Sequence, residues 1–277
     1  MDGIVMPELP EVETIKNVLK HNLVNETIEW IQIHYAPLLE TNSEFQIAHL
    51  SGKTFKDVKR RGKYLIFEFE DCYWVVHLRM EGKFYLYDDI TPITKHTHVE
   101  FKTQNHHVHY LDTRKFSRMA IISDLDAYFK TKNLGYEPFD PGLSVSFLKE
   151  RFKNRKRAIK SVLLDQSHIT GIGNIYADEI LFRAKLHPET PANKLSDQDL
   201  KNIIEETKLV LQKAIDEGGT TIRSYTSSLG VTGRFQVTLK AYGREGEPCT
   251  VCDRPLTKIK VGGRGTVFCE TCQKEKP

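Results

Sequence analysis

The stretch CTVCDRPLTKIKVGGRGTVFCETC, residues Cys249–Cys272, decides the fold of the C-terminal end of this chain. Two residues separate the cysteines within each pair, and 16 residues separate the two pairs. At this spacing, two short turns present four thiolates to one tetrahedral zinc ion. Four sulfur ligands leave no open coordination position for a reacting water. The sequence therefore predicts a zinc ribbon with one structural Zn2+, bound by Cys249, Cys252, Cys269 and Cys272.

The residues between the two cysteine pairs form a candidate phosphate contact. Val261–Thr266 reads VGGRGT. Glycines let a backbone approach a phosphate closely, and the guanidinium of Arg264 can hold phosphate oxygens in a fork. The fifth cysteine, Cys72, adjoins the apolar stretch Tyr73–Leu78, so we expect it to be buried and without a metal role.

Length and charge limit the function only loosely. The 277 residues suffice for two domains with cores of their own. The 40 Lys and Arg residues against 37 Asp and Glu give a net charge of +3, too small to indicate a nucleic-acid partner alone. No apolar run has transmembrane length and no signal-peptide core follows Met1, so we expect a cytoplasmic protein that uses no membrane.

Two segments are candidate anion sites. Arg151–Lys160 holds six cations and no acid, which fits either a solvated helix face or a phosphate-binding patch. Arg155 and Lys160 are our candidates for the second role. Gly171-Ile-Gly173-Asn174 precedes a predicted helix, where free N–H groups and the helix dipole attract an anion. It lacks the third glycine of a dinucleotide fingerprint and the Gly-Lys-Ser/Thr of a P-loop.

The first half of the chain has the pattern of a β-rich domain. Helical spacing over Glu13–Leu23 is followed by short β-branched and aromatic runs, broken by Gly, Asp and Asn. Many closely spaced strands favour a sandwich or barrel over βαβ units. The predicted strands are Trp30–Tyr35, Tyr64–Phe69, Tyr73–Leu78, Phe84–Tyr87, Val99–Phe101 and Met119–Ile122.

The second half is predicted to be helical after a linker. The segment NLGYEPFDPGL, with two prolines and two glycines, fits a domain linker. The predicted helices are one capped by Ser144 or Ser146, one over Arg157–Gln166, one over Ile175–Lys185, and a long one from the capping box at Ser196 to Gly218. We therefore expect an α+β multidomain chain with an N-terminal domain at 1–132, a linker at 133–143, a helical domain at 144–238 and the ribbon at 239–277.

Met6–Glu13, with the sequence MPELPEVE, is a candidate reaction centre. If synthesis begins at Met6 and the methionine is trimmed, Pro7 carries a free secondary amine. Such an amine can attack an electrophilic carbon and give an iminium, more readily where burial or cations favour loss of its proton. Glu8 is then placed to shuttle protons. The same letters also fit a simple turn and helix start, because proline suits a first helical turn.

Several segments together resemble one family, the bacterial formamidopyrimidine-DNA glycosylases, which cut oxidised purines out of DNA. Their order matches that of the family, and they extend over about the whole chain. Besides MPELPEVET they are RRGKYL at Arg60–Leu65, HLRMEG at His77–Gly82, DTRKF at Asp112–Phe116, GIGNIYADE at Gly171–Glu179, YGREGEPC at Tyr242–Cys249 and GRGT at Gly263–Thr266.

The resemblance implies a fold and a reaction. It implies an N-terminal β-sandwich with a flanking helix, a helix-two-turn-helix domain and a zinc ribbon. It implies a bifunctional glycosylase and AP lyase that forms a Schiff base and then cuts the strand by β,δ-elimination. The catalytic residues implied are Pro7, Glu8, Lys63 and Arg264. Without the resemblance, Lys63 reads as a surface cation beside a strand.

The resemblance also implies the DNA contacts. Met80, Arg114 and Phe116 match the residues that fill the gap left by an extruded nucleotide. His96 and Asn174 match DNA contacts, although His96-x-His98 alone also has a spacing that can hold metal. The implied partner is double-stranded DNA with oxidised purines (8-oxoguanine, formamidopyrimidines) or abasic sites. The enzyme is expected to be a monomer of the bacterial cytoplasm, on the nucleoid through DNA, with Ile222–Phe235 as a mobile cover.

One departure and two alternatives remain. Met1–Val5 precede Met6, and a proline nitrogen inside a peptide bond is not nucleophilic, so we expect the active polypeptide to begin at Pro7. The sister class, endonuclease VIII, acts on oxidised pyrimidines. Its members begin with a sequence similar to PEGPE and lack the Met/Arg/Phe set, whereas this chain has PELPE and all three residues. A DNA-binding module without catalysis also accounts for a zinc ribbon and basic helices.

Overall fold

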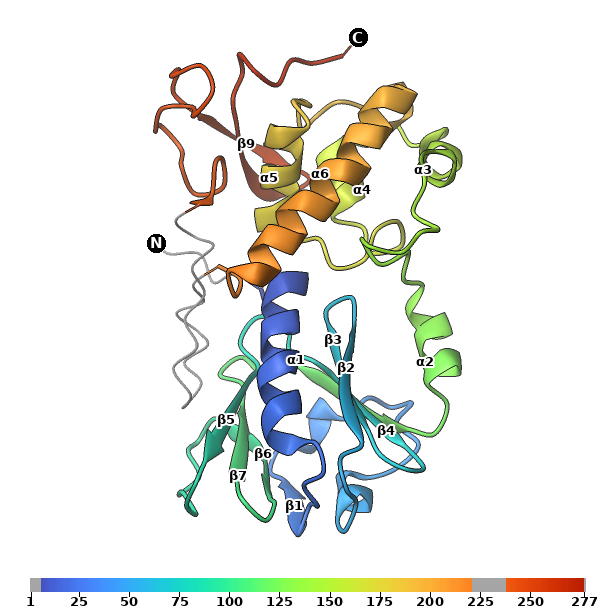
Figure 1. Cartoon of the computed structure of the whole chain (residues 1–277), viewed down its shortest axis with the longest axis vertical. Coiled ribbons are helices and arrows are strands. Elements are labelled where there is room, and N and C mark those ends of the chain that lie inside the picture. Colours follow the sequence, from blue (N-terminus) through green and yellow to red (C-terminus); the bar gives the residue numbers. More distant parts are fainter. Residues whose placement is uncertain (1–5, 221–237, 277) are drawn as a thin grey trace. The chain divides into compact units, whose positions relative to one another are not determined.

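The structure, a computed structural model, describes residues 6–220 and 238–276. These residues form two compact units (Figure 1). The first contains residues 6–132 and 218–220, and the second contains residues 133–217 and 238–276. The predicted cover, Ile222–Phe235, lies outside the described residues. Within the two described ranges, no helix is both long and apolar enough to cross a bilayer.

The first unit contains two four-stranded antiparallel sheets. In sheet order, one consists of β1 (Trp30–Ile33), β6 (Thr97–Lys102), β7 (His107–Leu111) and β5 (Lys83–Tyr87). The other consists of β2 (Asp57–Arg61), β3 (Tyr64–Glu68), β4 (Tyr73–His77) and β8 (Arg118–Ile122). Short helical elements complete the unit: η1 (Ala36–Leu38), η2 (Ile47–Leu50) and α2 (Leu125–Lys132).

Aromatic side chains from both sheets meet in one core, which confirms the predicted sandwich. Phe67 and Trp74 of one sheet stack with ring centroids 4.9 Å apart, and Phe84 of the other sheet meets Phe67 edge-on at 5.5 Å. Phe101 and Tyr110 belong to the same buried cluster. Alternating strand residues point to opposite faces, so each sheet gives one apolar face to this core.

Helix α1 (Leu9–Leu23) flanks the sheets and contributes to the same core (Figure 1). Its buried Val12, Ile15 and Leu19 recur at helical spacing. The helix begins at Leu9, not at Glu13 as the apolar spacing predicted, because Pro10 lies in its first turn and needs no N–H partner there.

The second unit is helical and ends in a hairpin. Its elements are α3 (Val145–Phe152), α4 (Ile159–Leu163), α5 (Asn174–Arg183), η3 (Ala192–Lys194), α6 (Asp197–Asp216), β9 (Thr257–Val261) and β10 (Arg264–Phe268). The Ser144 hydroxyl accepts from Phe147 N and caps α3. The predicted capping box of α6 is confirmed, with both Ser196–Asp199 bonds present. Gly218 and Gly219, at φ 76° and 79°, follow the end of α6.

Candidate functional site

Pro7 and Glu8 are buried where α1 begins. Glu8, 2% exposed, is the N-cap residue, and its backbone N–H donates to Glu11 Oε2 at 3.0 Å. The other oxygen, Glu11 Oε1, accepts from the backbone N–H of Thr220 at 2.9 Å and from the Thr220 hydroxyl at 3.1 Å. Glu11 therefore ties the Pro7-Glu8 segment to residues far along the chain. A Cβ at Gly219 would lie 2.9 Å from Glu11 Oε1, so this approach requires glycine.

Lys63 lies in the two-residue turn between β2 and β3, after Gly62 at φ 56°. It is 6% exposed, so its reading as a surface cation is wrong. Arg60 fixes the turn, because its Nε donates to Glu13 Oε2 of α1 at 2.7 Å and its Nη1 donates to the Gly62 carbonyl at 3.0 Å. The tip that carries Lys63 is thereby fastened to α1.

The charge balance at this turn follows from its neighbours. Burial raises the pKa of Glu13, but hydrogen bonds from Lys16 and Arg60 and their charges outweigh it, and the net pKa is lowered. Burial, with the charges of Arg79, Lys63 and Lys132, holds the pKa of His77 well below its ordinary value. His77 Nδ1 accepts from the Arg79 backbone N–H at 3.1 Å, which fits a neutral imidazole.

Met80, Arg114 and Phe116, which are far apart in sequence, come together at the surface of the first unit. The Arg114 guanidinium lies 4.7 Å from the centre of the Phe116 ring, and its Nη1 is 3.2 Å from Met80 Sδ. Phe116 is 48% exposed. A cation, a flexible thioether and an exposed ring thus form one group that can enter a base stack.

Asp112, which sequence analysis did not single out, shapes the loop that carries Arg114. Its carboxylate accepts from the backbone N–H groups of Arg114 at 2.9 Å and Ser117 at 2.8 Å. An aspartate that begins a loop commonly bonds in this way, and that pattern was the available signal. The Asp112 backbone contacts both residues of the HxH motif: its N–H donates to the His96 backbone carbonyl, and its carbonyl lies 2.7 Å from His98 Nε2. Neither histidine belongs to a metal-ligand group in residues 6–220 and 238–276.

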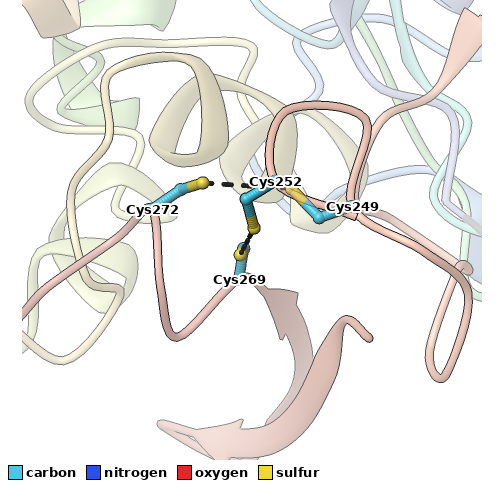
Figure 2. Close-up of side chains that lie close together, drawn as sticks. All are labelled: Cys249, Cys252, Cys269 and Cys272. Carbon is cyan, nitrogen blue, oxygen red and sulfur yellow. Dashed lines mark hydrogen bonds between the residues drawn. The ribbon is translucent and has the colours of Figure 1, made fainter. Parts of the chain in front are cut away.

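The four cysteine side chains converge in the second unit (Figure 2). Cys249 Sγ lies 4.0 Å from Cys272 Sγ, and Cys252 Sγ lies 3.5 Å from Cys269 Sγ. Two sulfurs bound to zinc at tetrahedral angles are about 3.8 Å apart, so the donor set fits one Zn2+. Phe182 of α5 and Leu256 pack with the buried cysteines, which docks the ribbon on the helices.

Arg264 is exposed beside the β9–β10 turn. Gly262 and Gly263 form the turn at φ 55° and 80°, which matches a type I′ hairpin turn. Asn174, the first residue of α5, donates from Nδ2 to the Gly265 carbonyl at 3.1 Å. The start of α5 and the strand that carries Arg264 are therefore neighbours. Arg155 is exposed between α3 and α4 and remains a candidate contact.

Lys160 requires a correction. It is 0% exposed, and its Nζ donates to Asp178 Oδ1 at 2.6 Å, to Thr266 Oγ1 at 2.7 Å and to the Gly265 carbonyl at 2.9 Å. A side chain with no exposed surface does not reach a phosphate, so the predicted DNA contact is wrong for Lys160. Its bonds join α4 to α5 and to β10.

Two acidic residues of α5, which sequence reasoning missed, also hold the ribbon against the helices. Asp178 Oδ2 accepts from the Val267 N–H at 3.0 Å, and burial raises the Asp178 pKa to about 6 although Lys160 opposes the shift. The Glu179 carboxylate accepts from the backbone N–H groups that enter the ribbon, those of Lys240, Ala241 and Tyr242. Both carboxylates lie inside the GIGNIYADE motif, whose adjacent acids on a buried helix were the overlooked signal.

Comparison with known proteins places these features in one family. The sequence models of the formamidopyrimidine-DNA glycosylase N-terminal domain, its H2TH domain and the zinc finger found in FPG and IleRS match residues 6–119, 134–226 and 246–274. The formamidopyrimidine-DNA glycosylase of Listeria innocua is 42% identical, over 97% of this chain and 100% of its own. That of Bacillus cereus is 43% identical, over 97% of this chain and 99% of its own.

Solved structures agree. A Lactococcus lactis Fpg bound to abasic-site DNA matches with a TM-score of 0.91 and 40% identity, over 97% of this chain and 100% of that chain. A variant of the same protein bound to Fapy-dG DNA matches with a TM-score of 0.92 and 40% identity, with the same coverage.

The β-sandwich, the helical unit and the zinc finger together define a DNA repair glycosylase. The chain belongs to the formamidopyrimidine-DNA glycosylase family.

Proposed function

We propose that this glycosylase removes oxidised purines, 8-oxoguanine and formamidopyrimidines, from double-stranded DNA and then cuts the strand as an AP lyase. The L. lactis relatives bound to Fapy-dG and abasic-site DNA support this substrate class. The observation that carries the proposal is the fixed start of α1. There, Pro7 and Glu8 are buried and held through Glu11 in a chain that belongs to a glycosylase family.

In the proposed first step, the lone pair of the free Pro7 nitrogen attacks C1′ of the deoxyribose. The bond from C1′ to the base breaks, and the base leaves with that electron pair and takes up a proton. The sugar ring opens as Glu8 exchanges protons with it, and an iminium joins Pro7 to C1′. β- and δ-elimination then release the phosphates on either side, and Lys63 and Arg264 assist.

The nucleotide must leave the helix before Pro7 can reach it, which costs a few kcal/mol in unstacking. Met80 and Phe116 offset this cost by filling the gap as apolar wedges. Arg114 hydrogen-bonds the orphaned base, which we propose is cytosine. His96, Arg155 and Asn174 contact the DNA backbone.

The wider setting is also a proposal. The enzyme acts as a monomer in the bacterial cytoplasm and reaches the nucleoid through DNA. Its domains span 1–132, 144–238 and 239–277, with a linker at 133–143. The first compact unit passes into the second between Lys132 and Asn133, which supports the proposed boundary at residue 132.

Borohydride trapping on abasic DNA tests the nucleophile. A form that begins at Pro7, with its terminus verified by mass spectrometry, should become covalently linked to DNA. The intact 277-residue form should bind but not be trapped, because its Pro7 nitrogen is an amide. Pro7→Gly in the trimmed form should retain weak trapping, since it keeps a primary amine.

Pro10→Ala is the matched control, because it removes the other proline of the motif and leaves the terminal amine intact. If the intact form, verified by mass spectrometry, cleaves as fast as the trimmed form, Pro7 is not the nucleophile. A trimmed form that binds DNA without trapping or cleavage would favour a DNA-binding module. Faster release of oxidised pyrimidines than of purines would favour the endonuclease VIII class.

A further inference from the structure

A second group of metal-ligand side chains lies in the first unit, on the β1-β6-β7-β5 sheet. Glu100 projects from β6, and His107 and His109 project from β7 two residues apart, with His109 directly opposite Glu100. Val108 and Tyr110 alternate with the histidines and belong to the core, so the three polar side chains share the opposite face. One ligand atom from each of the three lies within 4.8 Å of the others.

The two histidines are buried and incompletely bonded. Each is 1% exposed, and the Nε2 atom of each is buried without a hydrogen-bond partner. Glu100 Oε2 lies 3.4 Å from His107 Nε2 and 3.9 Å from His109 Nε2. The shorter distance exceeds the normal N–H···O range, and buried nitrogens without partners cost stability. A cation between these three atoms would give each of them a partner.

Neighbouring side chains hold the group in place. His34 Nε2 contacts the other carboxylate oxygen, Glu100 Oε1, at 2.9 Å. The Trp30 ring lies 5.6 Å from the His107 ring, and the Tyr87 ring lies 5.0 Å from the His109 ring. Aromatic neighbours restrict the rotation of both imidazoles, which lowers the entropy cost of ordering them around an ion.

We propose that Glu100, His107 and His109 bind a divalent first-row transition metal, Zn2+ foremost, while His34 holds the other oxygen of the Glu100 carboxylate. Imidazole nitrogens with one carboxylate are a zinc donor set, whereas Mg2+ and Ca2+ take oxygen ligands. Zinc ligands at about 2.1 Å stand about 3.4 Å apart at tetrahedral angles, so small side-chain rotations close the present spacing. The site is separate from the proposed catalytic group and from the cysteines, and its role is to brace β1, β6 and β7.

Metal binding has a proton consequence at His107. The Thr91 backbone N–H donates to His107 Nδ1 at 2.9 Å, so neutral His107 carries its proton on Nε2. An ion that binds Nε2 displaces this proton, which moves to Nδ1 as the Thr91 N–H bond opens. Thr91 therefore reports occupancy through its amide exchange.

The test begins with the full chain carrying zinc in its ribbon. It is dialysed against micromolar free Zn2+, and bound zinc is counted by mass spectrometry. The wild type should hold a second ion, which should raise the melting temperature and speed amide exchange at Thr91. His107→Asn/His109→Asn should hold only the ribbon ion, because asparagine keeps a polar group at the position of Nδ1 and lacks Nε2. His21→Asn/His106→Asn, outside the cluster, is the matched control and should keep both ions.

A total of one bound ion in the wild type, or of two in the cluster variant, overturns the proposal. Co2+ uptake by the wild type gives an answer even if the cluster variant fails to fold. Co2+ bound by imidazole and carboxylate as the second metal ion adds absorption without a thiolate charge-transfer band. Added charge-transfer intensity would place the Co2+ on cysteine and overturn the proposed site. None of these outcomes depends on glycosylase activity, so the proposed function stands or falls separately.

Discussion

At the scale of single residues, Arg114 is the sharpest test of how the damaged nucleotide is replaced. Arg114 is exposed, and its guanidinium contacts Met80 Sδ and the Phe116 ring. Arg114→Ala should reduce discrimination between cytosine and adenine opposite the lesion about 10-fold, since one good base contact contributes about 1–3 kcal/mol. Cleavage of a preformed abasic site should fall less, because no damaged base has to be extruded.

The measurement is the rate of single-turnover cleavage on matched duplexes. Lys115→Ala, which removes the neighbouring cation that lies over Tyr35, is the control. Equal losses on lesion and abasic duplexes would mark Arg114 as a phosphate contact, and the salt slope of binding would then fall by about one.

His77 makes stability depend on pH. Burial and the charges of Arg79, Lys63 and Lys132 hold the pKa of folded His77 well below its ordinary value. As the pH falls below the ordinary pKa of histidine, His77 takes up a proton in the unfolded chain but stays neutral in the folded chain. The unfolding free energy should therefore fall by up to about 1.4 kcal/mol per pH unit from this group.

Urea unfolding at pH 7.5 and 5.5 measures this dependence. His77→Asn keeps an acceptor for the Arg79 N–H and should flatten the slope, whereas His21→Asn on the exposed face of α1 should leave it unchanged. A slope as steep in the His77 variant as in the wild type would show that other groups cause the acid sensitivity.

At the scale of elements, the buried Lys160–Asp178 pair holds β10 against α4 and α5. Lys160→Met leaves the Asp178 carboxylate buried without its cation, which should lower the unfolding free energy by about 3–5 kcal/mol. Adding Asp178→Asn should recover much of this loss, because the neutral amide still accepts from the Val267 N–H. Thermal unfolding of Lys160→Met, of Asp178→Asn and of the double variant measures the coupling. An unchanged melting temperature, with a salt slope of DNA binding lower by about one, would instead restore Lys160 as a phosphate contact.

The elements predicted from sequence were those with a regular apolar pattern. Strands such as β4 and β8 are buried at most positions and read directly as β-branched runs. Among the α-helices and strands of the first unit, three were missed. β2 (DVKRR) has one buried residue, β7 (HVHYL) carries histidines where alternation leads one to expect exposed polar residues, and α2 has only Tyr128 buried. In each, tertiary contacts supply what the local pattern lacks.

Of the candidate site, only the zinc ligands could be predicted from local spacing. The cysteine spacing follows from zinc geometry, and the four thiolates do converge. The gathering of Met80, Arg114 and Phe116 and the burial of Lys63 depend on strand pairing that no local rule contains. The supporting carboxylates Glu11 and Asp112 act through backbone N–H groups, and such contacts leave little trace in a sequence.

At the scale of the whole molecule, the two units have separate cores, so losing the zinc should affect them unequally. The ribbon cysteines pack with Phe182 and Leu256, whereas the main core of the first unit contains none of these residues. Metal removal or Cys269→Ser should unfold the ribbon, displace Arg264 and abolish tight DNA binding. Both tryptophans, Trp30 and Trp74, lie in the first unit, so their fluorescence should keep its folded signal. Undiminished DNA cleavage by protein verified as metal-free would contradict this expectation.

The bond between Glu11 and Thr220 has a consequence for biosynthesis. Its partners lie 209 positions apart, so the segment that carries Pro7 is anchored only after Thr220, beyond the end of α6, has left the ribosome. Closing so long a loop costs chain entropy that early contacts cannot repay. A nascent chain that ends before residue 218 should thus carry a folded sandwich with an unanchored start. We therefore expect a ribosome-bound chain that ends before residue 218 to give no borohydride-trapped adduct with abasic DNA.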